Sequence, residues 1–417
     1  MPETPAQTVS AIPDLADIES ARQIVARVAQ PTPIETSRFL AEVLGSDVLL
    51  KLENLQRTGS YKIRGAYYRM SRLSAEEKTR GVVAASAGNH AQGVAFAARE
   101  LGIKATIFMP LGVALPKLQA TRDYGADVLL RGHTVEEPLR AAAEYAATTG
   151  AVLIPPFDHP DVIVGQGTLG LEIFDQAPDF ETIIIPIGGG GLISGVASAV
   201  KQRAAADGRQ VRVIGVQAAN AAAYPPSLEA GVATEIRTSA TIADGIAVAK
   251  PGILNFEIIR QLVDEIVTVS EADIARAILV LLERAKLVVE PAGAVGVAAI
   301  LAGQISNAGK TVVILSGGNI DPLLMQRVIS HGLAASDRYL KLRIMLPDRP
   351  GQLARTSEIV AEANANVIEV LHTRHGGGMQ LSEVELELSV ETRGPEHRAE
   401  VVEKLREAGY DPRLVLD

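Results

Sequence analysis

Two hydrophobic patterns alternate along the chain between about residue 45 and residue 330. Short runs rich in Val, Ile and Leu are separated by longer Ala-rich segments, in which apolar residues recur with helical spacing. Runs that are apolar along their whole length predict strands buried on both faces, as in parallel sheets covered by helices. We therefore predict an α/β domain with mostly parallel sheets. The predicted strands are residues 47–53, 81–86, 104–110, 126–130, 181–187, 211–217, 265–270 and 311–318.

The pattern changes near Ser336, where strands with alternating polar and apolar residues begin. The order predicted for this tail is strand, helix, strand, strand, helix, strand. That order is typical of a ferredoxin-like α+β module. We therefore predict two domains, residues 1–335 and residues 336–417.

Composition narrows the class of protein. The 417 residues are 47% hydrophobic, which is ample for a large core. The net charge of −9, with no long Lys/Arg run, argues against nucleic acid or an anionic membrane as a partner. The chain has no cysteine, which excludes disulfides, thiolate metal sites and cysteine nucleophiles. It shows neither a signal-peptide pattern nor an apolar stretch of ~18 residues, so we expect a soluble, cytoplasmic protein.

Four glycines at residues 188–191 join a predicted strand directly to a predicted helix. Backbone N–H groups in such a turn, together with the positive end of a helix dipole, form a cradle for an anion such as phosphate. The G-x-G-x-x-G spacing of dinucleotide sites is not met, because Ile193 and Ser194 stand where the third glycine is needed. The alternative is a tight strand–helix turn without a ligand.

Two other predicted strands end in small polar residues. In SAGNHAQG (residues 86–93), backbone donors could receive a carboxylate, or Ser86 or Asn89 could simply cap the helix. Ser316 lies beside two glycines at the end of another strand. Ligands of open α/β sheets gather at the carboxyl ends of strands, so these motifs together predict one ligand site.

Lys62 lies among small residues in TGSYKIRGA (residues 58–66), where a solvated surface lysine is not expected. A phosphate cradle, donors for a small carboxylate, a strand-end hydroxyl and this lysine together suit pyridoxal 5′-phosphate. That cofactor forms a Schiff base with lysine and acts as an electron sink for carbanions at the α-carbon of amino acids. Arg64, two residues further on, is expected to be a residue of a structural ion pair or of a helix face.

Five ordered motifs carry a family resemblance: TGSYKIRGA, SAGNHAQG, GGGGL, TIADGIAV and SGGN. Roughly residues 20–330 resemble the serine/threonine dehydratase branch of the fold-type II pyridoxal-phosphate enzymes. This implies two open, twisted, mostly parallel sheets, with a small subdomain at about residues 56–152. The tail, with LPDRPGQLA at its first strand–helix junction, resembles an ACT regulatory domain. The resemblance implies β-elimination of L-threonine, and less well of L-serine, to a 2-oxoacid and ammonia by a homodimer or homotetramer.

The resemblance also implies the roles of individual residues. Lys62 would hold the cofactor and remove the substrate's α-proton, Asn89 would bond the 3′-oxygen, and Ser316 would meet the pyridine nitrogen. The implied cofactor-binding residues are Lys62, Tyr61, Asn89, Gly188, Gly189, Gly190, Gly191, Leu192, Gly245 and Ser316. The implied substrate-binding residues are Ser86, Ala87, Asn89 and His90.

Two departures from the family pattern narrow the expected chemistry. Serine racemases of this branch have a second serine, which reprotonates the opposite face, where this chain has Ala87; elimination is therefore favoured. The stretch QAANAAAYPP, at residues 217–226, offers no carboxylate, so we expect no strong Mg²⁺ or Ca²⁺ site. Glu290 is expected either near the cofactor or merely at a helix N-terminus.

Several alternatives remain open from the sequence alone. The junction residues Asp348, Arg349, Pro350 and Gly351 are expected to expose backbone donors to an effector amino acid, but the tail could instead serve oligomerisation alone. The lysine could act on another hydroxyamino acid, such as a 3-hydroxyaspartate. The chain could also be an amino-acid sensor whose catalytic domain is a remnant.

Overall fold

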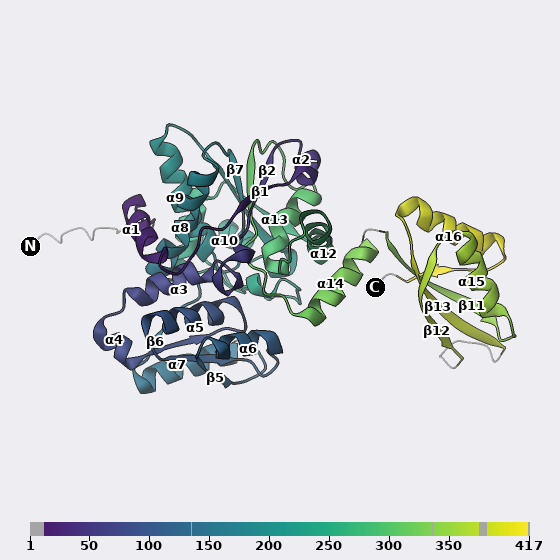
Figure 1. The fold of residues 1–417 in the computed structure, drawn as a ribbon, viewed down its shortest axis with the longest axis horizontal. Helices are drawn as coiled ribbons and strands as arrows, with labels where there is room; N and C mark the ends of the chain where they lie inside the picture. The colour runs from purple at the N-terminus through teal and green to yellow at the C-terminus, as the bar shows by residue number, and fades with distance from the viewer. Residues whose placement is uncertain (1–11, 135, 336, 375–381, 416–417) are drawn as a thin grey trace, which may run out of the picture. The chain divides into compact units, whose positions relative to one another are not determined.

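The computed structural model describes residues 12–134, 136–335, 337–374 and 382–415 (Figure 1). The chain forms two compact units, which divide between Leu324 and Met325. Helix α14 (Pro322–Ala335) runs across this division.

The larger sheet of the first unit has six strands in the order β1-β2-β10-β7-β8-β9. Every neighbouring pair is parallel except β1 with β2. The strands β2, β7 and β10 are buried along their whole length, as their continuous apolar runs predict. The six strands are β1 (Ile34–Thr36), β2 (Val48–Lys51), β7 (Thr182–Pro186), β8 (Arg212–Ala218), β9 (Glu265–Val269) and β10 (Thr311–Ile314).

The smaller sheet of the first unit has four parallel strands in the order β5-β4-β3-β6. They are β3 (Val82–Ala85), β4 (Ala105–Met109), β5 (Asp127–Leu130) and β6 (Val152–Leu153). The two sheets confirm the predicted α/β class. Strands β1 and β6 are three and two residues long, too short to carry the pattern from which the other strands are predicted.

Helices cover both faces of the larger sheet. Ile183 and Ile185 of β7 pack in one core cluster with helices α8 and α9, whereas Ile184 contacts Gly296 of α13 on the other face. The helices of this unit are α1 (Leu15–Val25), α2 (Arg38–Leu44), α3 (Lys62–Ser71), α4 (Ala75–Arg80), α5 (Asn89–Leu101), α6 (Leu115–Asp123), α7 (Glu136–Thr149), α8 (Pro160–Gln176), α9 (Gly191–Ala206), α10 (Tyr224–Ala230), α11 (Ile253–Leu262), α12 (Glu271–Val280) and α13 (Pro291–Leu301). Short helical turns are η1 (Glu53–Leu55), η2 (Arg57–Gly59), η3 (Ala219–Ala221), η4 (Asp244–Ile246) and η5 (Leu281–Ala285).

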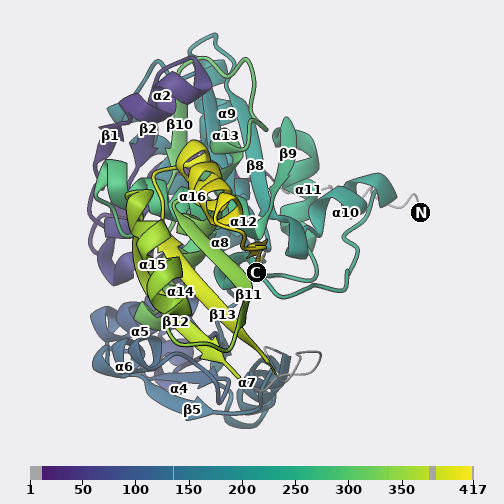
Figure 2. The ribbon, with the colours of Figure 1, turned by 90° about the vertical axis from the view of Figure 1, so that its right-hand side faces the viewer.

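The second unit contains one antiparallel sheet in the order β12-β13-β11-β14. Helices α15 and α16 lie on the same face of this sheet (Figure 2), where they pack on alternate strand residues such as Leu342 and Leu386. The elements are β11 (Tyr339–Pro347), α15 (Gln352–Glu362), β12 (Asn366–Thr373), β13 (Glu383–Glu391), α16 (Pro395–Glu407) and β14 (Arg413–Leu414). Their order confirms the predicted ferredoxin-like module. Across the described residues of both units, no helix is long and apolar enough to cross a membrane.

Candidate active site

The carboxyl ends of parallel strands carry the motifs that are predicted to bind a ligand. Gly188 follows β7 and Ser316 follows β10, and these two strands are neighbours in the larger sheet. Ser86 follows β3 of the smaller sheet, and Asn89 opens the next helix, α5. The Asn89 side chain bonds to residues from the larger-sheet region, so the two sheets meet at one site.

The loop that precedes Lys62 is held by backbone just after β10. Ser60 and Gly317 form an antiparallel bridge, and the N–H of Tyr61 donates to the carbonyl of Ser316 at 3.2 Å. Lys62 is the first residue of α3 and follows this bridge directly. The predicted covalent anchor is therefore fixed beside the strand end that carries Ser316.

The amine of Lys62 has an unusual environment for a lysine. Its Nζ donates a hydrogen bond to the carbonyl of Pro156 at 2.9 Å and lies 5.3 Å from the centre of the Tyr61 ring. Burial lowers the pKa of Lys62 to about 8, although the charge of Glu290 acts in the opposite direction. The amine is thus held in place and is easier to deprotonate than an ordinary lysine.

The glycine loop fits closely against two aromatic side chains. A Cβ at Gly189 or Gly191 would lie within 3 Å of Phe157, the residue after the Lys62 acceptor. Gly190 has a φ of +102°, and a Cβ there would lie 2.1 Å from the hydroxyl of Tyr224. Backbone amides in the first turn of α9, which begins here, have no acceptor within their own helix. The loop therefore presents free donors at a positive helix end, which suits a phosphate.

Asn89 bonds across the site and does not cap its helix. Its Nδ2 donates to Glu290 Oε1 at 2.6 Å, and its Oδ1 accepts from Asn319 Nδ2 at 2.8 Å. Asn319 also donates to the carbonyl of Thr58 at 2.7 Å, and a Cβ on Gly59 would collide with its side chain. Asn319 therefore fixes which end of the Asn89 amide is the donor. The only sequence signal for Asn319 is its place in the SGGN motif.

Glu290 lies inside the site and is more than a helix-terminus charge. Its side chain is buried, and burial followed by the charge of Asp244 raises its pKa to about 7. A Cβ on Gly245 would lie 3.8 Å from Glu290 Oε1, and one on Gly188 would lie 3.0 Å from the Cα of Ile246. The turn η4, which holds Gly245, therefore lies close to both the glycine loop and Glu290.

The loop from Ser86 to His90 offers backbone more than side chains. Ser86 Oγ accepts from the N–H of Gly88 at 3.1 Å, which forms a local turn. His90 Nε2 donates to the carbonyl of Ile154 at 2.9 Å, and burial lowers the pKa of His90 to about 3. The imidazole is therefore neutral, and its N–H is already bonded to the carbonyl of Ile154. The groups of His90 and Ala87 that remain for a carboxylate are their backbone amides.

A buried ion network anchors the helix that carries Lys62. Arg64 pairs with Glu53 and with Glu172, each at 2.8 Å, and Lys51 pairs with Glu172 at 2.5 Å. The prediction that Arg64 forms a structural ion pair is confirmed. Because these charges come from η1, β2 and α8, they fix the position of α3 under the site.

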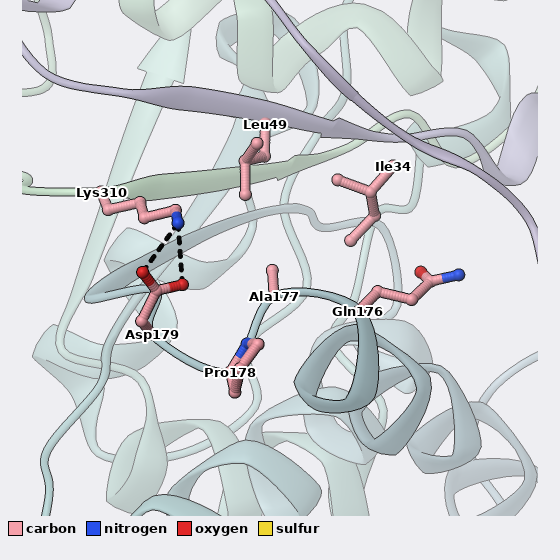
Figure 3. A pocket seen from close by; sticks show the side chains of 7 residues that line it. All are labelled: Ile34, Leu49, Gln176, Ala177, Pro178, Asp179 and Lys310. Atoms are coloured by element: carbon pink, nitrogen blue, oxygen red, sulfur yellow. Dashed lines mark hydrogen bonds and ion pairs between the residues drawn. The ribbon is translucent and has the colours of Figure 1, made fainter.

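A hollow at the opposite edge of the larger sheet is not part of this site. Figure 3 shows it between the Lys310–Asp179 ion pair, with N–O distances of 2.8 Å, and the apolar side chains of Ile34, Leu49 and Ala177. Lys310 and Asp179 precede β10 and β7, so the hollow lies at the amino ends of the strands. Its charges already pair with one another.

The four predicted effector residues lie in the second unit. Asp348, Arg349, Pro350 and Gly351 are exposed between β11 and α15. Gly351 has a φ of +95° and precedes the first residue of α15, a backbone conformation that favours glycine.

The fold and the site define a pyridoxal-phosphate-dependent enzyme of fold type II. Residues 25–317 match the family model for pyridoxal-phosphate dependent enzymes, and residues 341–409 match the model of the ACT domain. The chain therefore belongs to the family of pyridoxal-phosphate-dependent enzymes and carries a C-terminal ACT domain.

Among known proteins, this chain is similar over nearly its whole length to two proteins that are each named L-threonine ammonia-lyase. One, from Thermotoga maritima, is 47% identical over 401 residues, which cover 96% of this chain and 99% of the relative. The other, from Geobacter sulfurreducens, is 46% identical over 394 residues, with 94% and 97% covered.

Two solved structures share the fold of the first unit. The processed form of threonine deaminase isoform 2 from Solanum lycopersicum has a TM-score of 0.72 and 37% identity, covering 79% of this chain and 98% of its own. Maize serine racemase has a TM-score of 0.71 and 34% identity, with 77% and 98% covered. Lyases and a racemase thus share this fold, so the reaction depends on individual residues.

Proposed function

We propose that this chain is an ammonia-lyase that converts L-threonine to 2-oxobutyrate and ammonia, and L-serine to pyruvate and ammonia. The observation that carries the proposal is the position of Lys62: the loop before it is bridged to the backbone after Ser316, and its amine bonds to Pro156, next to the Phe157 that packs on the glycine loop. The similarity to full-length relatives named L-threonine ammonia-lyase supports the choice of substrate.

The donors at the site fit pyridoxal phosphate. The amides of residues 188–192 suit its phosphate, Asn89 suits its 3′-oxygen, and the Ser316 hydroxyl suits its pyridine nitrogen. Lys62 would form the covalent bond to its aldehyde carbon. When bound, the cofactor supplies an electron sink for negative charge at the substrate's α-carbon. The other tasks fall to side chains of this protein.

Lys62 is suited to move the α-proton. Burial lowers its pKa to about 8, which favours the neutral amine relative to an ordinary lysine, and only the neutral amine can accept a proton. The Pro156 carbonyl and the Tyr61 ring hold Nζ in one place, which favours transfer at a single face of the substrate.

Ala87 supports elimination over racemisation. It lies in the loop that we propose binds the substrate carboxylate, and its methyl group can neither give nor take a proton. The site therefore lacks, at this position, the second proton donor that racemisation needs. This favours lyase chemistry over the activity named for the maize structure of similar fold.

We also propose that an amino acid controls the enzyme through its ACT domain. The exposed turn of Asp348, Arg349, Pro350 and Gly351 offers backbone donors next to a helix N-terminus, a suitable place for a carboxylate. We place this turn at an interface between copies of the chain in a cytoplasmic homodimer or homotetramer.

The test is an assay of 2-oxoacid and ammonia release by the full-length holoenzyme. A panel of L-threonine, L-serine and 3-hydroxyaspartate should give the highest kcat/KM with L-threonine, and adding isoleucine or valine should change the rate. Preferred release of oxaloacetate would identify a 3-hydroxyaspartate dehydratase instead. A purified protein that binds no cofactor and releases no ammonia would support the amino-acid sensor.

A further inference from the structure

An ion pair joins the two sheet regions at the rim of the site. Lys117 on α6, beside the smaller sheet, donates from Nζ to Oδ2 of Asp244 on η4 at 2.9 Å. The turn η4 lies in the connection between β8 and β9 of the larger sheet. The pair therefore links the smaller-sheet region to the loop that holds Gly245.

Lys117 faces inward and Asp244 faces outward. The Lys117 side chain is 13% exposed and that of Asp244 is 53% exposed. Nζ of Lys117 would lie 3.7 Å from a Cβ on Gly88, in the loop that we propose binds the substrate carboxylate. A long cation buried to this extent beside that loop is poised to meet an anion.

Lys117 carries its positive charge among several carboxylates. Three carboxylates, those of Asp244, Glu290 and Asp321, act on Lys117. Burial would lower the pKa of Lys117, but Asp244 and the other two carboxylates outweigh it and raise the pKa above the ordinary value. Lys117 therefore keeps its proton near neutral pH, and its positive charge offsets part of the negative charge that an arriving carboxylate meets.

We propose that Lys117 is a substrate-binding residue that receives the α-carboxylate, and that Asp244 excludes substrates with a second carboxylate. In this arrangement Lys117 binds one carboxylate, the α-carboxylate of the substrate. The exposed oxygens of Asp244 repel a second carboxylate on the substrate's side chain. The pair would thereby select threonine and serine over acidic hydroxyamino acids. This inference rests on the proposed function and deepens it.

The test separates binding from turnover in the full-length holoenzyme. Lys117→Met should raise KM for L-threonine about 10- to 100-fold, since it removes a charged contact, with much less change in kcat. Lys117→Arg keeps the charge and should recover most of the loss. If Lys117→Met lowered kcat and melting temperature with KM unchanged, the pair would be structural only and the inference would fail.

Binding of two unreactive amino acids tests the role of Asp244. L-Alanine and L-aspartate have no leaving group for this elimination, so their affinities can be read from the change in cofactor absorbance. Asp244→Asn should tighten binding of L-aspartate about 10-fold more than that of L-alanine. Equal changes for the two ligands would overturn the selectivity role. These titrations remain informative even if the wild type releases no 2-oxoacid from threonine, an outcome that would defeat only the proposed function.

Discussion

Two lysines of the first unit, Lys51 and Lys62, differ in what their ammonium groups contact. Nζ of Lys51 donates to Glu172 at 2.5 Å, to the carbonyl of Thr32 at 2.6 Å and to Gln176 Oε1 at 2.7 Å. Nζ of Lys62 donates to one acceptor within the described part of the chain, the carbonyl of Pro156. One lysine has all three of its protons bonded and the other has two left over.

This contrast supports the proposed role of Lys62 better than the pKa does. Burial lowers the pKa of both residues, so the direction of the shift does not distinguish them. The charge of Glu172 opposes the effect of burial on the pKa of Lys51, and the Lys51 ammonium has an acceptor for each of its protons. We therefore assign Lys51 a structural role. Among the residues that the structure describes, no carboxylate bonds to the amine of Lys62, so this amine keeps the capacity to react.

Replacing Lys62 should have the largest effect. Lys62→Ala removes both the covalent anchor and the base, and should lower turnover of L-threonine by about 10⁴-fold or more. Borohydride reduction followed by mass spectrometry should attach the cofactor to Lys62 in the wild type, and equally in Lys51→Met as the matched control. Turnover by Lys62→Ala within tenfold of the wild type would contradict the assignment.

Replacing Lys51 should instead reduce stability. Lys51→Met leaves Glu53 and Glu172 with Arg64 as their one bonded cation, and breaking such a buried network costs about 3–5 kcal/mol of unfolding free energy. Adding Glu172→Gln removes the excess negative charge and should recover part of that loss. Denaturant melts of the three proteins provide the measurement, and an unchanged midpoint for Lys51→Met would show that the network does not stabilise the fold.

The raised pKa of Glu290 predicts that the site region and the buried ion network respond to pH in opposite ways. Its folded pKa of about 7 lies above the ordinary value of 4.5, so the folded chain holds this proton more tightly than the unfolded chain. Its unfavourable contribution is therefore absent below pH 4.5 and fully present above about pH 7, where it reaches about 3 kcal/mol. Glu290→Gln in the cofactor-free protein should gain stability over the wild type as pH rises across that window. A constant difference in melting temperature would count against the raised pKa.

Glu53→Gln is the matched control of opposite sign. Burial opposes the charge of Glu53, but Arg64 outweighs burial and holds the pKa of Glu53 below its ordinary value. Its contribution to stability is present above pH 4.5 and is lost as the pH falls below that value. The cost of Glu53→Gln should therefore be full at pH 7 and should shrink in acid.

The sequence predicts the fold and the site to different depths. Strands such as residues 181–187 can be predicted because they contain an unbroken apolar run, residues 183–187, and the glycines that follow locate a ligand loop. The direction of the His90 ring cannot be predicted from the sequence, since it depends on a hydrogen bond to the backbone of Ile154, 64 residues away. The Lys117–Asp244 pair joins residues 127 positions apart and has no motif of its own. Such pairings depend on how loops of two sheets approach each other, which spacing along the chain does not encode.

The bridge between Ser60 and Gly317 has a consequence for engineering this enzyme. Main-chain hydrogen bonds, which do not depend on the side chains that line the pocket, set the place of Lys62. Ala87 and Asp244, for which we propose roles in substrate choice, can then be exchanged while the backbone that positions Lys62 stays where it is. The fold can therefore keep Lys62 in place while the side chains that select the substrate change during evolution.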